Sequence, residues 1–422
     1  MKILQVNAVN GVLSTGRTVT ELAAGLEARG IENRTAYSMG PKPEHGYRIG
    51  TSVEKTTHAL GSRLLGRQAY FSSRGTRGLL RYIDDESPDV VHLRNLHGNY
   101  IHLPMLLEYL GERDIPTVVN LDDCWFFTGK CCHYTIDGCH RWETGCGSCP
   151  RLRKDNPSWF IDATARMWAD KRRLFEAIPR LGVIGVSDWI SSEVERSFLS
   201  CASIIRRIYN WVDLDLFRPR PMREARERLG LPLDGVISLG VAGGWSDAKG
   251  LSDFNELARM LTVPGSGGDS TAAAAARRVS IVLVGGMGRR TAVSRDIVVV
   301  GVTHDVGELA DYYSAADAFL QLSPEETFGK VTAEALACGT PAVVYDSTAN
   351  PELVRSGCGY VVDCGDIPQV LSRVSRIAAE GKREYSERCR WFAKMHFEKE
   401  SLIDEHVALY EELRAIGGGS TR

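Results

Sequence analysis

Short apolar runs alternate along the chain with longer segments in which apolar residues recur every three or four positions. The first run covers residues 3–6, and residues 18–28 follow it with an apolar helical face made of Val19, Leu22, Ala23 and Leu26. Further short runs occur in both halves of the chain, at residues 89–93, 116–121, 181–186, 235–241, 279–284, 296–300, 318–322 and 342–345. Strands that alternate with helices predict an α/β fold built on parallel, doubly wound sheets.

The chain is long enough for two such sheets. With 422 residues, it exceeds the roughly 250–300 residues at which a single hydrophobic core stops growing. Pro219 and Pro221 interrupt regular structure near the middle, where we expect the boundary between two domains. Residues 262–278, rich in glycine, serine and alanine, are typical of a flexible insertion between a helix and a strand.

Composition and charge exclude several classes of protein. The 51 basic and 53 acidic residues give a formal net charge of −2, which does not favour binding to nucleic acid. No stretch reaches the roughly 18 apolar residues with few or no charges that indicate a membrane-spanning helix. The N-terminal apolar run is too short for a signal peptide, so we expect a cytoplasmic protein with its cysteines in a reducing compartment.

Two glutamates, Glu326 and Glu334, frame the segment with the strongest chemical signal. The segment follows the apolar run at residues 318–322, and Gly329 precedes a helix expected at residues 331–338. Ligands of parallel sheets bind beyond the carboxyl ends of the strands, and the first N–H groups of a helix attract anions. Carboxylates at this place can hold sugar hydroxyls. The alternative is that both are solvated glutamates at a helix start, where the helix dipole favours them.

These glutamates and two further segments resemble the GT4-type retaining GT-B glycosyltransferases, the group 1 family. Seven residues separate Glu326 from Glu334, and Ala-Cys-Gly-Thr-Pro follows, ending at Pro341, as in the family's signature. Residues 210–219 resemble the segment that leads into the family's second domain, and residues 308–317 resemble the helix before its donor loop. The resemblance implies the GT-B architecture, in which two Rossmann-like, doubly wound α/β domains face a cleft.

The resemblance also implies a role for each domain. Residues 1–205 would bind the acceptor and residues 206–394 the nucleotide sugar, while a C-terminal helix at residues 395–416 would return to the first domain. The implied reaction moves a sugar from a nucleotide-diphosphate sugar, a UDP- or GDP-sugar, to a saccharide or polyprenyl-diphosphate-linked acceptor, with retention of configuration. A catalytically silent nucleotide-sugar-binding partner, and a sugar epimerase or hydrolase on the same fold, stay open as alternatives.

By resemblance, the donor-binding residues lie in the second domain. Glu326 is expected to bind hydroxyls of the donor sugar and Glu334 the ribose of the nucleotide, and the donor loop between them contains Thr327, Phe328, Gly329 and Lys330. No nucleophile is evident in the sequence. We therefore expect attack on the face that the leaving group occupies, assisted by the donor's own phosphate.

Lys249 is the expected phosphate contact. It follows the run at residues 235–241 and matches the lysine with which the family neutralises the leaving diphosphate. Gly243 and Gly244 stand where the family generally has an arginine, so one cation is missing. We expect its replacement from one of three residues, Lys330, Arg289 or Arg290. No catalytic divalent metal is expected, because Lys249 and helix N-termini can neutralise the diphosphate.

The first domain contributes three candidates in loops that follow strands. Gly16 lies in the first loop, where the lack of a side chain lets backbone approach a phosphate or the acceptor. His97 is a candidate for the acceptor's base, and Asp122 replaces a histidine that many relatives carry. An aspartate there would repel phosphate unless a cation pairs with it, and Asp122 or Asp123 could instead cap a turn. His97 and Asp122, together with Glu326, form the expected catalytic set.

A cluster of cysteines follows in the same region. Cys146 and Cys149 have the two-residue spacing of metal ligands, and Cys131 and Cys139 complete the four thiolates of a tetrahedral zinc site. The adjacent Cys131 and Cys132 point in different directions, so we expect only one of them to be a ligand. Packed reduced thiols, or a reversible disulfide, are the alternatives, and His133 and His140 compete as ligands. By resemblance, similar cysteine-rich inserts occur in a subset of the family linked to surface-polysaccharide assembly.

Residues 63–81 combine basic and apolar side chains. The basic ones are Arg63, Arg67, Arg74, Arg77 and Arg81. Such a stretch predicts a peripheral contact with an anionic membrane, here the inner face, or with a lipid-diphosphate acceptor. The alternative is an ordinary solvated helix face.

Overall fold

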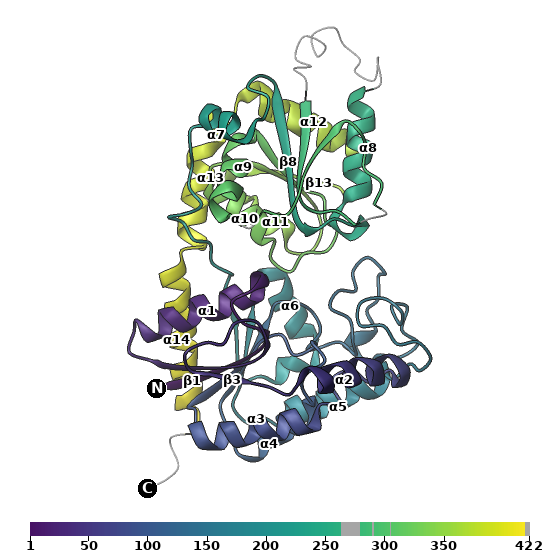
Figure 1. Cartoon of the computed structure of the whole chain (residues 1–422), viewed down its shortest axis with the longest axis vertical. Helices are drawn as coiled ribbons and strands as arrows, with labels where there is room; N and C mark the ends of the chain where they lie inside the picture. Colours follow the sequence, from purple (N-terminus) through teal and green to yellow (C-terminus); the bar gives the residue numbers. More distant parts are fainter. Residues whose placement is uncertain (263–278, 289–290, 304, 418–422) are drawn as a thin grey trace. The chain divides into compact units, whose positions relative to one another are not determined.

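A computed structural model describes residues 1–262, 279–288, 291–303 and 305–417 (Figure 1). The chain divides into two compact units. Unit 1 comprises Met1–Ile208 and Glu400–Arg422, and unit 2 comprises Tyr209–Lys399. The domains expected from the sequence change at residues 205 and 394, close to these boundaries. Residues 263–278 of the expected insertion, and both Arg289 and Arg290, lie outside the described residues.

Unit 1 is built on a seven-stranded sheet with the strand order β3-β2-β1-β4-β5-β6-β7, in which neighbouring strands are parallel. Its strands are β1 Lys2–Val9, β2 Glu32–Met39, β3 Gly46–Arg48, β4 Val90–Leu93, β5 Thr117–Leu121, β6 Leu181–Gly185 and β7 Ile204–Arg207. Its helices are α1 Leu13–Glu27, α2 Ser52–Leu65, α3 Ser73–Glu86, α4 Leu103–Glu112, α5 Thr164–Glu176, α6 Asp188–Arg196 and, for the part after Lys399, α14 Lys399–Ala415.

Unit 2 is built on a six-stranded parallel sheet with the order β10-β9-β8-β11-β12-β13. Its strands are β8 Val236–Gly244, β9 Val279–Gly286, β10 Ile297–Val300, β11 Ala318–Gln321, β12 Ala342–Tyr345 and β13 Gly359–Val362. Its helices are α7 Met222–Leu229, α8 Leu251–Thr262, α9 Val306–Ala315, α10 Lys330–Ala337, α11 Asn350–Leu353, α12 Ile367–Glu380 and α13 Arg383–His396.

The strand order of each sheet determines where a ligand can bind. All residues of β5 and β6 are buried, as expected of parallel strands that are covered on both faces. The order reverses between β1 and β4 in unit 1, and between β8 and β11 in unit 2. At such a switch point the two neighbouring loops diverge to opposite faces of the sheet and leave a crevice at the carboxyl edge.

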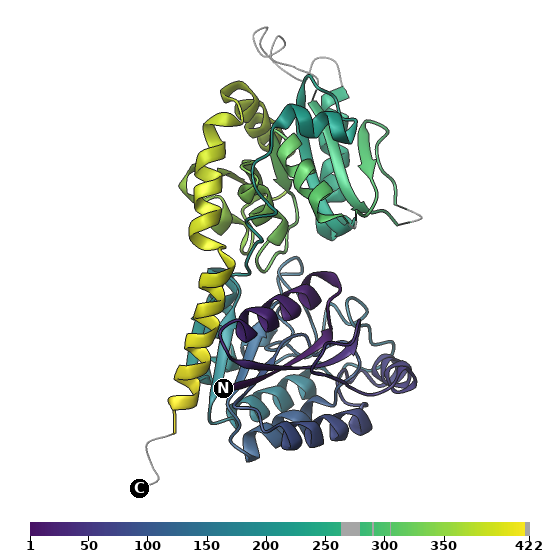
Figure 2. The same ribbon diagram turned by 60° about the vertical axis from the view of Figure 1, so that its left-hand side comes forward.

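The C-terminal helix α14 belongs to the core of unit 1. Figure 2 shows it, in yellow, running alongside the strands of this unit. The Tyr410 hydroxyl lies 2.8 Å from His92 Nδ1 of β4, and both side chains are buried. Arg29 of unit 1 forms ion pairs with Glu400 and Asp404. The sequence suggested a C-terminal helix at residues 395–416, and α14 covers Lys399–Ala415.

In unit 2, the side chain of Lys382 caps the C-terminal end of α9. Its amino group donates hydrogen bonds to the carbonyl oxygens of Tyr313 at 3.3 Å, Ser314 at 2.8 Å and Ala316 at 2.8 Å. The last carbonyl groups of a helix have no donor within the helix, so an ammonium group is a favourable cap. Burial lowers the pKa of Lys382 to about 8.

We predict that Lys382→Met destabilises unit 2 by roughly 2–3 kcal/mol, because the buried carbonyl groups of Ser314 and Ala316 lose the donor that Lys382 supplies, whereas that of Tyr313 keeps the Thr340 hydroxyl. The measurement is denaturant unfolding followed by circular dichroism. Lys394→Met, on an exposed position of α13, is the matched control and should leave the midpoint unchanged. Equal midpoints for the two variants would contradict the capping role.

Candidate functional site

The carboxyl edge of unit 2 brings together two of the predicted donor-binding residues. Lys249 ends a short 3-10 turn after β8, and Glu326 lies in the loop after β11. Their side chains meet in an ion pair, with Lys249 Nζ 2.5 Å from Glu326 Oε1. The lysine side chain is 39% exposed and the glutamate 16%. A cation and a carboxylate are therefore adjacent at the switch point of this sheet.

The loop that carries Glu326 is fixed by the segment after β12. The backbone N–H of Glu326 donates to Thr348 Oγ1 at 2.9 Å, and its carbonyl accepts from the N–H of Ala349 at 3.2 Å. Asn350 Nδ2 donates to the carbonyl of Ser323 at 2.9 Å. These bonds hold the backbone of the loop, so the backbone position of Glu326 does not depend on Lys249.

The donor loop enters α10 through Gly329, whose φ of 84° lies in the left-handed region. The ring of Phe328 is buried and packs against the rings of Tyr209 and Phe397, at centroid distances of 5.7 and 5.5 Å. Its side chain thus belongs to the core of unit 2, and only its backbone can reach a donor. Thr327 is likewise buried, and Lys330 is partly exposed at the first position of α10.

Glu334 lies in the second turn of α10 and is 8% exposed. Its Oε2 accepts a hydrogen bond from the Tyr313 hydroxyl at 2.9 Å. Burial and the adjacent carboxylate raise the pKa of Tyr313, so the hydroxyl stays protonated as a donor. Tyr313 was not among the predicted site residues, although it lies in the segment 308–317 that carried the resemblance.

The identity of the cation that replaces the missing arginine stays a prediction. A side chain at Gly243 or Gly244 would meet open space, since no heavy atom of the described residues lies within 4 Å of an added Cβ. Of the three proposed replacements, Lys330 alone is described. It begins α10 next to Gly329, and Arg289 and Arg290 lie outside the described residues.

In unit 1, Asp122 is paired with a cation that the sequence reasoning missed. Arg94 follows β4 directly and is 1% exposed. Its Nη2 lies 3.3 and 3.4 Å from the two carboxylate oxygens of Asp122, and its Nε and Nη1 have no partner in the described part of the chain. The pairing offsets the charge of Asp122. The one feature of the sequence that could have indicated this ion pair is a single arginine directly after a buried strand.

His97 and Asp123 form a second pair at this edge. His97 Nε2 lies 2.9 Å from Asp123 Oδ2, and the other oxygen of Asp123 accepts the N–H of Trp125. Burial raises the pKa of Asp123, but the charge and hydrogen bond of His97, together with the Trp125 N–H, lower it below its ordinary value overall. A histidine oriented by a carboxylate is the arrangement of a general base. Asp123, rather than Asp122, makes the expected turn contact.

The space beside Gly16 is filled by the chain itself. Gly16 is a buried residue of α1, and an added Cβ would lie 3.2 Å from the backbone nitrogen of Gly11 and 3.3 Å from the carbonyl carbon of Asn10. The glycine therefore lets the helix pack against its own preceding loop. A contact of Gly16 with phosphate or acceptor stays a prediction.

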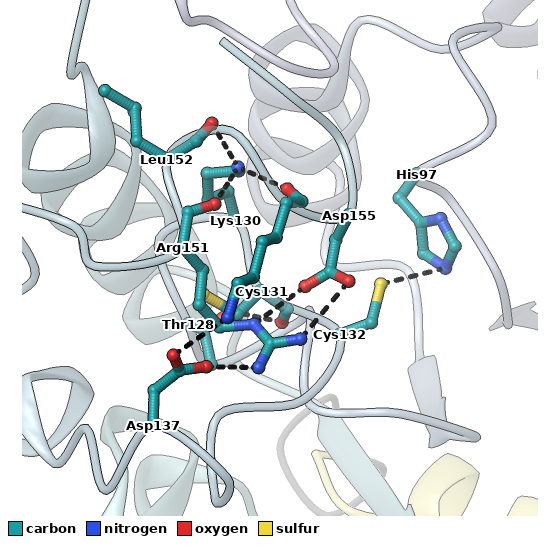
Figure 3. Close-up of polar contacts among 10 residues, drawn as sticks. His97, Thr128, Lys130, Cys131, Cys132, Asp137, Arg151, Leu152 and Asp155 are labelled. Carbon is teal, nitrogen blue, oxygen red and sulfur yellow. Dashed lines mark hydrogen bonds and ion pairs between the residues drawn. The ribbon is translucent and has the colours of Figure 1, made fainter. Parts of the chain in front are cut away.

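The four cysteines predicted as metal ligands line one small cavity. Cys131, Cys139, Cys146 and Cys149 all contribute to its wall. The adjacent Cys132 turns away from them, and its sulfur lies 3.8 Å from His97 Nε2 (Figure 3). The ligand atoms of His97, Asp123 and Cys132 lie within 4.8 Å of one another. Two groups of potential metal ligands thus share this region.

The stretch of basic and apolar residues at 63–81 contributes to two different surfaces of unit 1. Arg74, Arg77 and Arg81 lie on the exposed side of α3, opposite the buried Leu79, which is the solvated helix face considered as an alternative. One group of exposed apolar side chains lies instead on the C-terminal part of α2 and on a loop of unit 1 that is hydrogen-bonded to this helix. They are Leu60, Leu64, Leu65, Trp159, Phe160 and Ile161. None of the helices in the described residues has the length and apolar character to cross a membrane.

Two family models match the chain in sequence order. The model described as Glycosyltransferase Family 4 matches residues 15–216, and the model described as Glycosyl transferases group 1 matches residues 269–380. The first covers most of unit 1, and the second covers the part of unit 2 that contains Glu326 and Glu334. The chain belongs to the group 1, GT4-type glycosyltransferases, and its activity is that of a sugar transferase.

The relatives agree with this assignment. Over 77% of each chain, the protein is 25% identical to an Escherichia coli K12 protein named as a colanic acid biosynthesis glycosyl transferase, WcaC. It is 29% identical to a D-inositol 3-phosphate glycosyltransferase of Streptomyces bingchenggensis. That alignment covers 54% of this chain and about half, 53%, of the relative.

Solved structures show the same fold. Sucrose-phosphate synthase from Thermosynechococcus elongatus matches with a TM-score of 0.70 at 18% identity, over 98% of this chain and 99% of that one. Anabaena Alr3699/HepE in complex with UDP-glucose matches with a TM-score of 0.63 at 15% identity, over 97% and 99%. Together with the two parallel sheets, these matches place the protein in the GT-B fold class.

We predict that Arg94 and Asp122 depend on each other. Arg94→Met leaves the carboxylate of Asp122 without its cation, and Asp122→Asn leaves a buried guanidinium, so each should cost about 3 kcal/mol of stability. The double variant should lose less than the sum, by about 1–3 kcal/mol. Thermal and denaturant unfolding of the four proteins measure this. Losses that add within about 0.5 kcal/mol would show that the pair does not interact.

Proposed function

We propose that the protein transfers a sugar from a UDP- or GDP-sugar to a saccharide or polyprenyl-diphosphate-linked saccharide, with retention of anomeric configuration, in the assembly of a surface polysaccharide. The observation that carries the proposal is the contact between Lys249 and Glu326 at the switch point of unit 2, with Glu334 on the helix that follows. The chemistry of a nucleotide sugar fits this set, because it presents hydroxyls to carboxylates and a diphosphate to a cation.

Unit 2 would bind the donor through these three groups. Lys249 would leave its ion pair with Glu326 and approach the diphosphate, whose negative charge grows as the glycosidic bond breaks. The freed carboxylate of Glu326 would accept hydroxyls of the sugar, and Glu334 would accept those of the ribose. The N–H groups at the start of α10 would add positive potential for the phosphates.

Retention would follow from attack on the side of the leaving group. A carboxylate that accepts hydrogen bonds from several sugar hydroxyls is a weak nucleophile, so Glu326 is suited to orient the sugar and not to attack it. The oxygen of the leaving phosphate would accept the proton of the acceptor hydroxyl. No step in this scheme uses a catalytic metal ion.

Unit 1 would supply the groups that meet the acceptor. The charge of Asp122 is offset by Arg94, which permits an aspartate near a phosphate-bearing ligand. His97, oriented by Asp123, is suited to hold the acceptor hydroxyl by a hydrogen bond while the leaving phosphate takes its proton. A saccharide acceptor is supported by the name of the colanic acid relative, and a nucleotide-sugar donor by the UDP-glucose complex of the structural neighbour.

We predict that Glu326→Gln slows sugar transfer by about 100-fold or more, because an amide cannot replace the charge that orients the donor. Glu334→Gln should act mainly by raising KM for the donor, since its partner is the ribose. The donor is first identified by thermal shift with a panel of nucleotide sugars. Transfer is then measured as release of nucleoside diphosphate that depends on acceptor.

Glu256→Gln, which alters an exposed ion pair on α8, is the control and should retain full activity. A Glu326→Gln variant with wild-type turnover would contradict the proposed donor site. Release of nucleoside diphosphate without any acceptor would favour the hydrolase alternative. Binding of a nucleotide sugar without turnover by the wild-type protein would favour the silent binding partner.

We further propose that the protein works at the cytoplasmic face of a membrane and touches it through an apolar patch of unit 1, formed by Leu60, Leu64, Leu65, Trp159, Phe160 and Ile161. The loop that carries the aromatic residues is fixed on α2, because the N–H of Trp159 donates to the carbonyl of Arg63 at 2.7 Å. Arg63 and Arg67 next to this patch suit an anionic lipid surface. A lipid-linked acceptor would be reached from such a position.

We predict that Trp159→Ser combined with Phe160→Ser lowers binding to anionic vesicles by about tenfold or more, because two large apolar side chains no longer enter the lipid. Vesicle flotation measures this. Trp391→Ser combined with Met395→Ser removes two equally exposed apolar side chains from unit 2 and should change nothing. Equal binding of wild type and patch variant would contradict the proposal.

A further inference from the structure

The segment between β5 and α5 has an unusual structure. It runs from residue 122 to residue 163, and the only helix or strand described within it is a 3-10 turn at Arg141–Glu143. Long irregular segments inside compact domains are uncommon and need their own source of order. This segment is nevertheless well packed, and its buried side chains include Trp125, Phe127, Tyr134 and Trp142.

Four thiols lie at the centre of this segment. Cys131, Cys139, Cys146 and Cys149 surround a cavity of about 20 Å³, enough for one water-sized or ion-sized occupant and too small for an organic ligand. All four are free thiols. The Cys146 sulfur accepts a hydrogen bond from the N–H of Gly129 at 3.2 Å, a contact that stabilises negative charge on sulfur.

The backbone around Cys146 and Cys149 is shaped to present both side chains to the cavity. Gly147 has a φ of 144° and Ser148 a φ of 45°, a left-handed conformation that is rare outside glycine. Gly129 allows a further close approach, because an added Cβ would lie 3.0 Å from Cys146 Cβ and 2.7 Å from the carbonyl oxygen of Thr164. Such local constraint is expected where two ligands must converge.

Two buried lysines next to the cavity lack carboxylate partners. Lys130, which lines the cavity, donates to the carbonyl oxygens of Arg151, Leu152 and Lys154, each at 2.9 Å (Figure 3). Lys171 donates to the carbonyl oxygens of Trp125 and Thr128. Each lysine is 2% exposed, and neither forms an ion pair with a carboxylate of the described residues.

These lysines match the charge of a particular occupant. A divalent ion held by four thiolates carries two net negative charges, and two buried ammonium groups compensate them. Without such an anion, two charged lysines in the interior would be costly.

We propose that Cys131, Cys139, Cys146 and Cys149 bind one zinc ion as thiolates. Binding releases four protons to solvent and involves no change of oxidation state. Sulfur ligands in a set of four favour zinc over the harder divalent ions. The sulfurs are spread around the cavity more widely than the ligand atoms of His97, Asp123 and Cys132, so the proposal requires that side-chain rotation bring the four sulfurs together on the ion.

The zinc ion fixes the loop that carries the candidate site of unit 1. Cys132 follows the ligand Cys131, and its carbonyl accepts the N–H of Cys124 at 2.9 Å. Asp122 and Asp123 directly precede Cys124, and the Cys132 sulfur lies next to His97. The ion thus acts on the site through the backbone, as a positioning element. The proposal does not depend on which sugar is transferred.

The test is the zinc content of the full-length protein purified without chelators, measured by plasma mass spectrometry. We expect roughly one equivalent per chain in wild type and a loss to about a tenth or less in each of Cys131→Ser, Cys139→Ser, Cys146→Ser and Cys149→Ser. Cys201→Ser, which alters an exposed cysteine of the same unit, should keep the zinc. Cys132→Ser should keep it too.

A second measurement uses wild-type protein, so that it tests the site even if the cysteine variants fail to fold. Wild-type protein reconstituted with Co²⁺ should show the intense visible absorption of tetrahedral cobalt thiolate, and a chelator should lower the Tm and expose four further thiols to a thiol reagent. Zinc-free wild type that also takes up no Co²⁺ after reduction would overturn the proposal. Zinc lost in Cys132→Ser but kept in the other four variants would overturn it as well, by assigning the ion to His97, Asp123 and Cys132.

Discussion

The strands of both sheets are parallel, and this arrangement determines where the candidate site residues lie. Parallel neighbours need a crossover between them, so the loops that leave their carboxyl ends collect at one edge. Lys249 and Glu326 come from such loops after β8 and β11, and His97 and Asp122 from those after β4 and β5. The topology of the sheet therefore brings together residues that are far apart in the sequence, and no local sequence motif is needed for it.

At the carboxyl edge of each sheet, the charged side chains form ion pairs. In unit 2 the carboxylate of Glu326 is held next to Lys249, and a diphosphate can compete for that lysine. In unit 1 the buried Arg94 neutralises Asp122, which makes an aspartate acceptable where many relatives carry a histidine. The departure at Asp122 is thus accompanied by a compensating cation and does not by itself indicate a lost site.

Much of the fold followed from the sequence because buried parallel strands are continuous apolar runs. Among the missed strands, β2 lacks that pattern: it is mostly polar, and its buried Asn33 is satisfied by a hydrogen bond from Gln5. Within the site, the donor loop was found through its resemblance to a family. Arg94 was missed because a lone arginine after a strand usually lies on the surface. The ring of Phe328 is buried, and a contact of its backbone with the donor stays a prediction. Neither burial can be read from neighbours in sequence.

We propose that unit 2 holds a nucleoside diphosphate at the edge formed by Lys249, Glu326 and Glu334. Isothermal titration calorimetry with UDP, GDP and ADP tests it most directly, on wild type, Glu334→Gln and Asp122→Asn. We predict one site per chain for one of these nucleotides, with affinity weakened at least about tenfold by Glu334→Gln, a loss of about 1.4 kcal/mol, and little changed by Asp122→Asn. Binding that is insensitive to Glu334→Gln, or no binding of any of the three by wild type, would contradict it.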